Sequence, residues 1–508
     1  MRRVARDILL LALATGISRV FGLVRDVAIA DRFGAGAAYD AFLVAFFVPH
    51  FLRQLLAEGS LSTAFVPVYS GLRVSDEAGS SDADRFAGSL LSWLAVVFPL
   101  VVAAGVALAP IYVPFLASGF SPEKLALATR LTRILFPFIA LVGFASVFMG
   151  ILNAHHRFFA AALAPIWFNV GMILGVAVLA RLLPGEPILG LAVGALVGGA
   201  GQLLAQIPPL ARIGFRLRFR LWPIHPEIRR LLRLMAPALI ALAVTQVNLL
   251  VDNKLASYLD DGGISSLQYA MRLFQLPLGV FAVSVATALL PRFSTSWAIG
   301  DRGRFSEHLG DGMVASAMVL LPATAGLLVI GGDVIRLLFE HGTFSAADSA
   351  RTARVLAFYL IGLLPYGWIY VFSRAFYAMG RTVAPVVGSI VGVALNVSLD
   401  LALVGPMQAA GLALATGIAG LGTAAFLGVL LVSHMPRGGR LVRQLSATCV
   451  GTAGLFGLVA GVRAAIGDGP TALAVFVPMA AGILAYGLFV RFSPLWSLVG
   501  ALRRGRDA

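Results

Sequence analysis

Apolar segments of about 20 residues recur along the whole chain and are separated only by short polar breaks. An α-helix of that length crosses the hydrocarbon core of a bilayer, which is about 30 Å thick. Of the 508 residues, 59% are hydrophobic and only 12% are charged, whereas soluble domains carry about 25% charged residues. The sequence therefore predicts an all-α integral membrane protein with about 14 transmembrane helices and no soluble domain.

The predicted spans follow one another closely. They are residues 8–30, 38–58, 86–116, 125–153, 158–182, 188–211, 230–258, 264–290, 311–331, 352–378, 383–404, 409–432, 445–466 and 472–499. The first of these begins like a signal peptide, but no small-residue cleavage site follows, so we interpret it as a retained span.

Arginines between the spans set the predicted orientation, because short loops rich in Lys and Arg stay in the cytoplasm. With the N-terminus inside, the basic loops at 212–220, 302–304 and 437–443 and the tail at 503–506 all fall on the cytoplasmic side. Both termini are therefore predicted to be cytoplasmic. The formal net charge of +15 is explained by this topology, and no nucleic-acid partner is expected because no basic soluble module exists.

Two sequence echoes indicate an internal duplication. Residues 62–70 resemble residues 286–294, and residues 153–157 resemble residues 377–381, each pair at an offset of 224. Six spans per copy give both copies the same orientation. We predict two pseudo-symmetric six-helix lobes, an N-lobe at 1–222 (spans 1–6) and a C-lobe at 223–436 (spans 7–12). Residues 437–508 then form two C-terminal helices, spans 13 and 14.

Span 6 contains a ladder of three glycines at four-residue spacing, Gly190, Gly194 and Gly198. Small residues at this spacing let two helix backbones approach closely within a membrane. The ladder therefore indicates close helix packing rather than a binding site.

Four arginines lie inside predicted spans, namely Arg19, Arg25, Arg53 and Arg272. A charge at the bilayer centre costs about 2.5–3.5 kcal/mol on insertion scales unless it faces a wet cavity or a partner. A guanidinium group stays charged and binds phosphate oxygens in a bidentate way. The four arginines predict a site for a large anion, and a diphosphate would match it well.

Nearby carboxylates offer a structural alternative for part of this group. Arg25 could pair with Asp26 or Asp40, and Arg53 with Glu58, while charges near span ends could reach the membrane surface. The carboxylates are too few to neutralise every arginine, so the anion site remains the favoured interpretation.

A second polar group lies in the predicted C-lobe. It consists of Asp252 in span 7, Asn396 and Asp400 in span 11, and Thr416 in span 12. Asn396 and Asp400 are four residues apart and share one helix face, and hard oxygen ligands of this kind suit a small hard cation. The alternative is a hydrogen-bonded clamp between helices, with Asp252 paired to Lys254.

The chain carries no sequence motif for covalent chemistry. Its one cysteine, Cys449, excludes an intramolecular disulfide framework and a cysteine-built metal site. No motif of a catalytic nucleophile is present either, so we expect a transporter rather than an enzyme.

Several motifs together resemble one family. The chain is similar to the MurJ/MviN-type lipid II flippases of the MOP exporter superfamily through Ser18-Arg19-Val20, Arg25-Asp26, Phe33-Gly34-Ala35-Gly36, Asp40-Ala41-Phe42, Leu52-Arg53, Ala57-Glu58-Gly59, Ala64-Phe65-Val66-Pro67, Arg272-Leu273 and Leu289-Leu290-Pro291. The resemblance covers nearly the whole chain and is most specific from Ser18 to Pro67.

The resemblance implies a flippase that moves lipid II, a peptidoglycan precursor, from the cytoplasmic to the periplasmic leaflet of the bacterial inner membrane by alternating access, for cell wall synthesis. It implies a monomer in contact with membrane lipids and with cell-wall synthesis proteins, without an organic cofactor. The family's diphosphate-binding arginines correspond to Arg19, Arg25, Arg53 and Arg272. Spans 13 and 14 would form a groove for the lipid tail.

The resemblance also implies supporting and ion-binding residues. Asp26, Asp40, His50 and Glu58 match positions that support the cavity, although His50 stands where an asparagine is common and could add positive charge near neutral pH. Some members carry a sodium site in the C-lobe, with sodium as a coupling ion. The matching residues here are Asp252, Asn396, Asp400 and Thr416.

Two alternatives follow from the same observations. Another exporter of the superfamily, for polysaccharide units or for drugs, would share the core, but a drug exporter usually handles cations and a cationic cavity argues against it. A membrane glycosyltransferase that uses a lipid diphosphate would need catalytic acids on a sizeable outer loop, and the outer loops here are short.

Overall fold

The computed structural model describes residues 2–54, 61–75, 81–216, 219–222, 224–436, 438–467 and 469–504. Across these residues every regular element is a helix, and eleven helices are long and apolar enough to cross a membrane. These findings confirm the predicted all-α membrane protein. The count of 14 spans stays a prediction, because the helices in the regions of the first, second and seventh predicted spans (α1, α2 and α11) are not among the eleven.

Two compact units make up the chain, Met1–Gly262 and Gly263–Ala508. Unit 1 contains α1 (Arg2–Phe33), α2 (Ala37–Arg53), α3 (Leu61–Ser75), α4 (Ser81–Leu116), α5 (Pro122–Leu135), α6 (Phe138–Ala154), α7 (Phe158–Leu174), η2 (Gly175–Leu179), α8 (Ala180–Leu182), α9 (Pro187–Leu204), α10 (Ile207–Arg212) and α11 (Glu227–Ala256). The predicted boundary between lobes, at residues 222 and 223, precedes α11.

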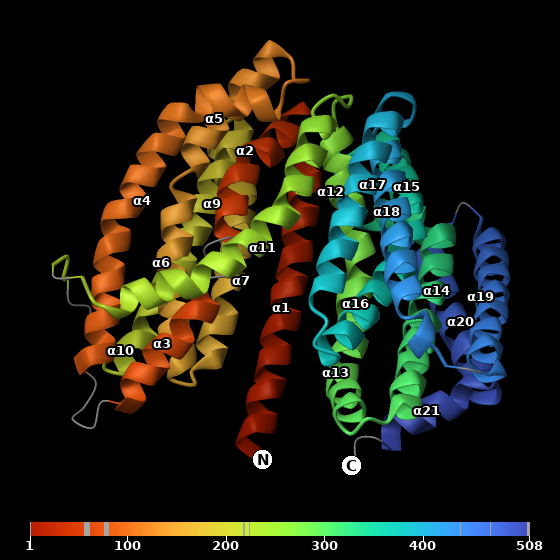
Figure 1. Ribbon diagram of the computed structural model, residues 1–508. Coiled ribbons are helices and arrows are strands. Elements are labelled where there is room, and N and C mark those ends of the chain that lie inside the picture. The colour runs from red at the N-terminus through yellow and green to blue at the C-terminus, as the bar shows by residue number, and fades with distance from the viewer. Residues whose placement is uncertain are drawn as a thin grey trace. The chain divides into compact units, whose positions relative to one another are not determined.

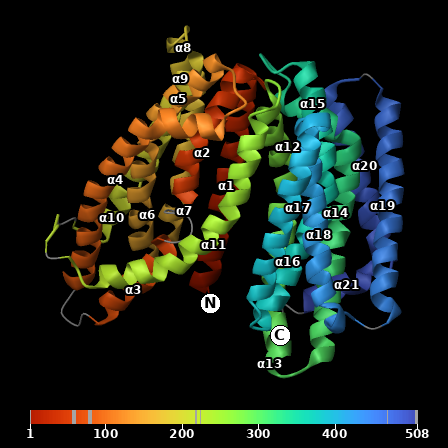
Figure 2. The same cartoon turned by 45° about the horizontal axis from the view of Figure 1, so that its top comes forward.

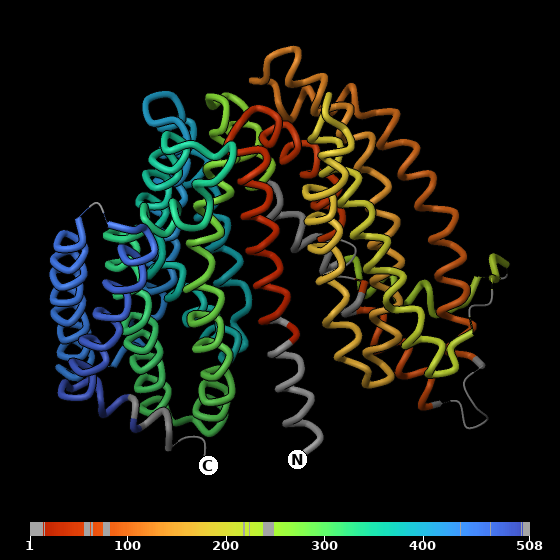
Figure 3. The backbone as a smooth tube through the Cα atoms, turned by 180° about the vertical axis from the view of Figure 1, so that it is seen from behind, coloured from red at the N-terminus to blue at the C-terminus, as the bar shows by residue number. Residues whose placement is uncertain are grey.

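In unit 1 a close approach between two helices is built on glycines. The helices α7 and α9 lie side by side (Figures 1 and 3). A Cβ atom added to Gly171 would lie 2.2 Å from the backbone nitrogen of Gly198, and one added to Gly194 would lie 2.6 Å from the Cα of Gly175. The interpretation of the glycine ladder as a packing motif is confirmed.

Hydrogen bonds tie both ends of α11 to α4 or to the turn that follows α4. Before α11 begins, the amide N–H of Arg220 donates to the hydroxyl of Ser92 in α4 at 2.7 Å. After α11 ends, the amide N–H of Gly119 donates to the hydroxyl of Ser257 at 3.1 Å. Figure 1 shows α11 running obliquely through unit 1 between these points.

Unit 2 contains α12 (Gly263–Pro277), η3 (Leu278–Ala282), α13 (Val283–Ala298), α14 (Arg302–Phe339), α15 (Ala346–Tyr359), η4 (Leu360–Gly362), α16 (Leu363–Ala378), α17 (Val383–Met407), α18 (Ala409–Leu430), η5 (Val432–His434), α19 (Gly439–Ile466), α20 (Thr471–Phe492) and α21 (Leu495–Arg504). The helices α19 and α20, from predicted spans 13 and 14, lie side by side (Figure 2). Arg463 of α19 holds Asp333 of α14 through two nitrogens, at 2.5 and 3.0 Å. The C-terminal pair of helices is thereby fixed to the rest of unit 2.

Each unit repeats one turn at the predicted offset of 224 residues. In unit 1 the N–H of Arg157 donates to the carbonyl of Leu152 at 2.9 Å, and in unit 2 the N–H of Arg381 donates to the carbonyl of Phe376 at the same distance. The residues before these arginines, His156 and Gly380, both have positive φ angles, 56° and 70°. The common helix-ending geometry agrees with the sequence echo.

Candidate functional site

A network of hydrogen bonds holds Arg25 between α1 and α7. Its Nε and Nη2 donate to Asp26 Oδ1 at 2.9 and 2.7 Å, and its Nη1 donates to Asn169 Oδ1 at 2.9 Å. The Asn169 amide in turn donates to the carbonyl of Ser18 at 3.3 Å. Asp26 and Asn169 are both buried. The Asp26 carboxylate compensates the charge of Arg25, and the three hydrogen bonds fix the orientation of its guanidinium group.

Arg19 differs from Arg25 in its surroundings. It lies on α1 six residues earlier, about 120° around the helix, and its side chain is exposed, as are the apolar neighbours Ile17 and Val20. This part of α1 therefore presents a charged group together with an apolar surface.

Asp40 belongs to an ion cluster with Lys124 and Asp261. Lys124 of α5 donates from Nζ to Asp40 Oδ2 at 3.0 Å and to Asp261 Oδ1 at 2.7 Å. The amide N–H of Gly262 also donates to Asp40 Oδ2, at 2.8 Å. Asp40 is 0% exposed, and a carboxylate removed from water needs partners of this kind. Its role in the structure is to join α2, α5 and the end of unit 1.

The start of α5 places Lys124 for this contact. The hydroxyl of Ser121 accepts the N–H of Lys124 at 3.3 Å, and Pro122 occupies the first helical turn. Both features are typical of a helix N-terminus.

The end of α2 carries His50 and Arg53, both half-buried. The His50 ring lies 5.7 Å from the Phe46 ring, centroid to centroid, and its Nε2 is 3.3 Å from the side-chain nitrogen of Gln54. Glu58, the predicted partner of Arg53, lies outside the described residues.

Arg272 lies on α12 in unit 2 and is half-buried. Five residues later, at Pro277, the helix passes into the π-helical turn η3. Such turns inside helices are frequent at functional sites. Three of the predicted anion-binding arginines therefore belong to unit 1, and the fourth belongs to unit 2.

The predicted oxygen ligands are divided in the same way. Asp252 lies on α11 in unit 1, where Asn248 donates to its Oδ2 at 3.0 Å. Its expected alternative partner, Lys254, has its Nζ 4.2 Å from the centre of the Phe115 ring.

In unit 2, Asn396 and Asp400 lie one turn apart on α17 and are 4% and 1% exposed. Thr416, on the adjoining helix α18, donates its hydroxyl to the carbonyl of Leu412 at 2.9 Å, which leaves the oxygen lone pairs as acceptors. These three residues supply only oxygen ligands from two packed helices. Within the described residues, no group of three or more His, Cys, Asp or Glu side chains is placed to hold a metal ion.

Two contacts at the site were not predicted from the sequence. Asn169 and Lys124 contact partners 144 and 84 residues away. In the sequence, Asn169 stands out only as a polar residue in an apolar span. No sequence feature near Lys124 indicates that it contacts Asp40.

Residues 29–487 match the family described as lipid II flippase MurJ. A protein of Thermotoga maritima named probable lipid II flippase MurJ is 35% identical over 407 residues, which cover 80% of this chain and 81% of the relative.

Solved structures are similar over nearly the whole length. One of lipid II flippase MurJ in an inward closed conformation has a TM-score of 0.80 and 29% identity, covering 95% of this chain and 98% of the other. An inward-facing multidrug resistance transporter of the MATE family in the MOP superfamily has a TM-score of 0.66 at 15% identity, covering 87% and 99%, and thus shares the fold. Because the family match covers most of the chain, the chain belongs to the lipid II flippase MurJ family.

Proposed function

We propose that this chain is a transporter that moves lipid II from the cytoplasmic to the periplasmic leaflet of the bacterial inner membrane. The observation that carries this proposal is the family match, which includes both units of the chain. The comparisons favour neither a multidrug or polysaccharide exporter nor a glycosyltransferase.

The proposed substrate contacts are the membrane arginines. Arg19, Arg53 and Arg272 bind the diphosphate, because guanidinium groups can hold its oxygens in a bidentate way. Arg25 adds to the positive field of this region, and its bond to Asn169 keeps α1 and α7 together. His50 supports the end of α2 beside Arg53.

Transport then follows an alternating-access cycle. The inward-open state admits the headgroup of lipid II, while the lipid tail stays in the bilayer or against α19 and α20. The two units rock, and the headgroup leaves on the other side. Both termini are cytoplasmic in this proposal, and the chain acts as a monomer that can receive lipid II near cell-wall synthesis proteins.

A vesicle assay tests the function directly. We expect vesicles containing the purified chain and headgroup-labelled lipid II to expose all of the label to an impermeant quencher, whereas protein-free vesicles expose only the outer leaflet. Labelled phosphatidylcholine in the same vesicles is the control for general lipid scrambling and should stay half protected. Equal lipid II quenching with and without protein would contradict the proposal.

We further propose that the chain binds a sodium ion, with Asn396, Asp400, Thr416 and Asp252 as its ligands. The buried carboxylate and the neighbouring oxygens fit a small hard cation. Bound sodium would compensate the charge of Asp400 within the membrane.

Sodium is therefore expected to stabilise the folded chain. At ten times its Kd, a ligand of the folded state adds about 1.4 kcal/mol, so the unfolding temperature should be higher in sodium than in choline. Asp400→Asn should abolish this difference, and Ser398→Ala, on the same helix, should retain it. Thermal unfolding in both salts measures the effect, and a sodium response that persists in Asp400→Asn would exclude this site.

A further inference from the structure

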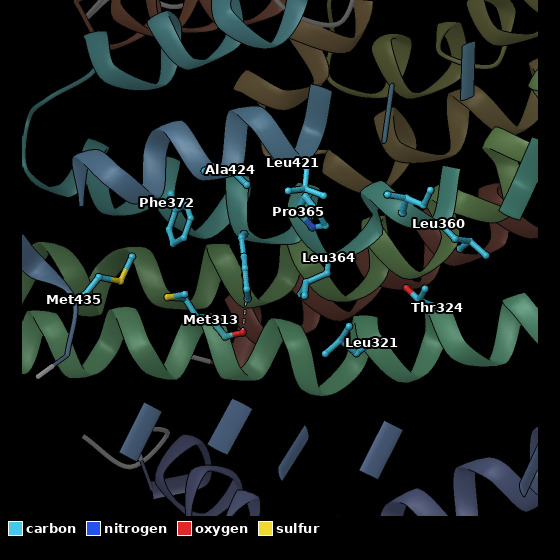
Figure 4. A pocket seen from close by; sticks show the side chains of 14 residues that line it. Met313, Leu321, Thr324, Leu360, Leu364, Pro365, Phe372, Leu421, Ala424 and Met435 are labelled. Carbon is cyan, nitrogen blue, oxygen red and sulfur yellow. Dashed lines mark hydrogen bonds between the residues drawn. The ribbon is translucent and has the colours of Figure 1, made fainter. Parts of the chain in front are cut away.

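An apolar slot of about 510 Å³ lies within unit 2, between α14, α16 and α18 (Figure 4). Met313 and Met435 lie at one end, and Thr324 and Leu360 lie at the other. The volume falls within the roughly 300–1,000 Å³ of ordinary ligand pockets. None of the lining residues belongs to α19 or α20, so the slot differs from the predicted groove for the substrate tail.

The slot is long and runs with the helices. Met313 and Thr324 are eleven residues apart on α14, which corresponds to about 16 Å along the helix axis. Ile361 and Leu421, at its rim, are 42% and 49% exposed. The slot is thus narrow and apolar, runs parallel to membrane-crossing helices and is open to the outside along one edge. A hydrocarbon chain has a matching shape.

The polar groups of the lining are already satisfied. The Trp368 indole N–H donates to the carbonyl of Met313 at 3.1 Å, and the Thr324 hydroxyl donates to the carbonyl of Leu320 at 2.8 Å. An occupant therefore finds no polar group that needs a partner, which favours an apolar chain over a polar molecule.

A basic rim, which we define as Arg302 and Arg381 with Trp297 and His434, adjoins the Met435 end of the slot. The guanidinium carbon of Arg302 lies 3.3 Å from the centre of the Trp297 ring, and the Trp297 and His434 rings are 5.6 Å apart. Burial lowers the pKa of His434, and the positive charges of Arg381 and Arg302 lower it further. His434 directly precedes Met435 in the chain.

Both arginines of the basic rim have exposed side chains. Tryptophan is enriched where a membrane meets water, and basic groups at that level attract anionic lipid headgroups. The basic rim thus supplies positive charge next to the Met435 end of the apolar slot.

We propose that this slot and rim bind one anionic phospholipid of the surrounding membrane. One acyl chain fills the slot past Met313 and Phe372, and the phosphate contacts Arg302 and Arg381. The proposal concerns a resident lipid and does not depend on which substrate the chain transports.

The test is a binding measurement on the full chain in detergent, by mass spectrometry of intact complexes. The probes are phosphatidylglycerol and phosphatidylcholine with identical acyl chains. We expect tighter binding of phosphatidylglycerol, and about 30-fold weaker binding after the double change Arg302→Gln and Arg381→Gln, from about 1 kcal/mol per arginine. The matched control is the double change Arg212→Gln and Arg229→Gln, at two exposed arginines of unit 1. It should leave phosphatidylglycerol binding unchanged.

A second variant tests the slot itself. Gly428 lines it, and a Cβ there would lie 3.6 Å from the Phe372 ring, an ordinary contact. Gly428→Leu should weaken the binding of both phospholipids at least tenfold. Gly454→Leu, whose Cβ would meet no atom within 4 Å, should leave the binding of both unchanged. Ala425→Phe fills the same slot if Gly428→Leu fails to fold.

Three results would overturn the proposal. They are unchanged phosphatidylglycerol binding in the double arginine variant, unchanged binding in a folded slot-filling variant, and binding of undecaprenyl diphosphate at this site with no binding of phosphatidylglycerol. The last result would make the slot part of the substrate path instead.

Discussion

Arg53→Ala is expected to abolish measurable lipid II movement and to weaken lipid II binding by about 10- to 150-fold. A hydrogen bond to a charged group is worth about 1.5–3 kcal/mol, and each 1.4 kcal/mol is a factor of ten. Arg53→Lys should retain part of the binding, because an ammonium group keeps the charge but lacks the planar fork of donors. Binding of purified variants to lipid II, followed by the vesicle assay, measures both effects.

Two further comparisons make this result specific. Arg19→Ala and Arg272→Ala should behave like Arg53→Ala. Arg212→Ala, which changes an exposed arginine at the end of α10, should bind as the wild type does. The thermal unfolding of each variant shows whether the fold is intact. If all three membrane-arginine variants bind lipid II as tightly as the wild type, the arginines have a structural role and the proposed diphosphate site is wrong.

Gly194→Leu is expected to prevent stable folding of unit 1. Its Cβ would lie 2.6 Å from the Cα of Gly175 and 2.7 Å from the carbonyl oxygen of Gly171, and these backbone atoms cannot rotate away. Overpacking of a core costs about 1–3 kcal/mol, and a whole leucine between two helix backbones should cost at least the upper figure. The yield of monodisperse protein and its unfolding temperature measure the loss.

The matched control for this change is Gly457→Leu. That glycine is exposed on α19, and its added Cβ would meet no atom within 4 Å. It should express and unfold like the wild type. A Gly194→Leu protein with an unchanged unfolding temperature would mean that α7 and α9 can separate without cost.

The positions of the helices and the contacts within one helix could be predicted from the sequence. Hydrophobic runs fix where a chain crosses the membrane, so the predicted spans fall on observed helices from α1 to α20. The pairing of Arg25 with Asp26 joins neighbours in the chain, and the glycine ladder repeats at helical spacing. Both could be read without knowing which helices are adjacent.

Contacts between distant segments could not be predicted in this way. The pairing of Asp40 with Lys124 depends on the packing of α2 against α5, and one sequence contains no local signal for that packing. The same holds for Asn169, which is one polar residue in an apolar helix until α7 is placed against α1. The anion and sodium sites remain predictions, since their residues come from both units.

The cluster around Asp40 lies next to the boundary between the two units. Asp261 and Gly262 are the last residues of unit 1, and both are held there by Lys124 and Asp40. Gly262 has a φ of 87°, a conformation that favours glycine, and Gly263 begins unit 2. If the units rock as proposed, the residues just before the boundary between them are anchored to α2 by Asp40 and to α5 by Lys124, and the first peptide bond beyond this anchor joins two glycines.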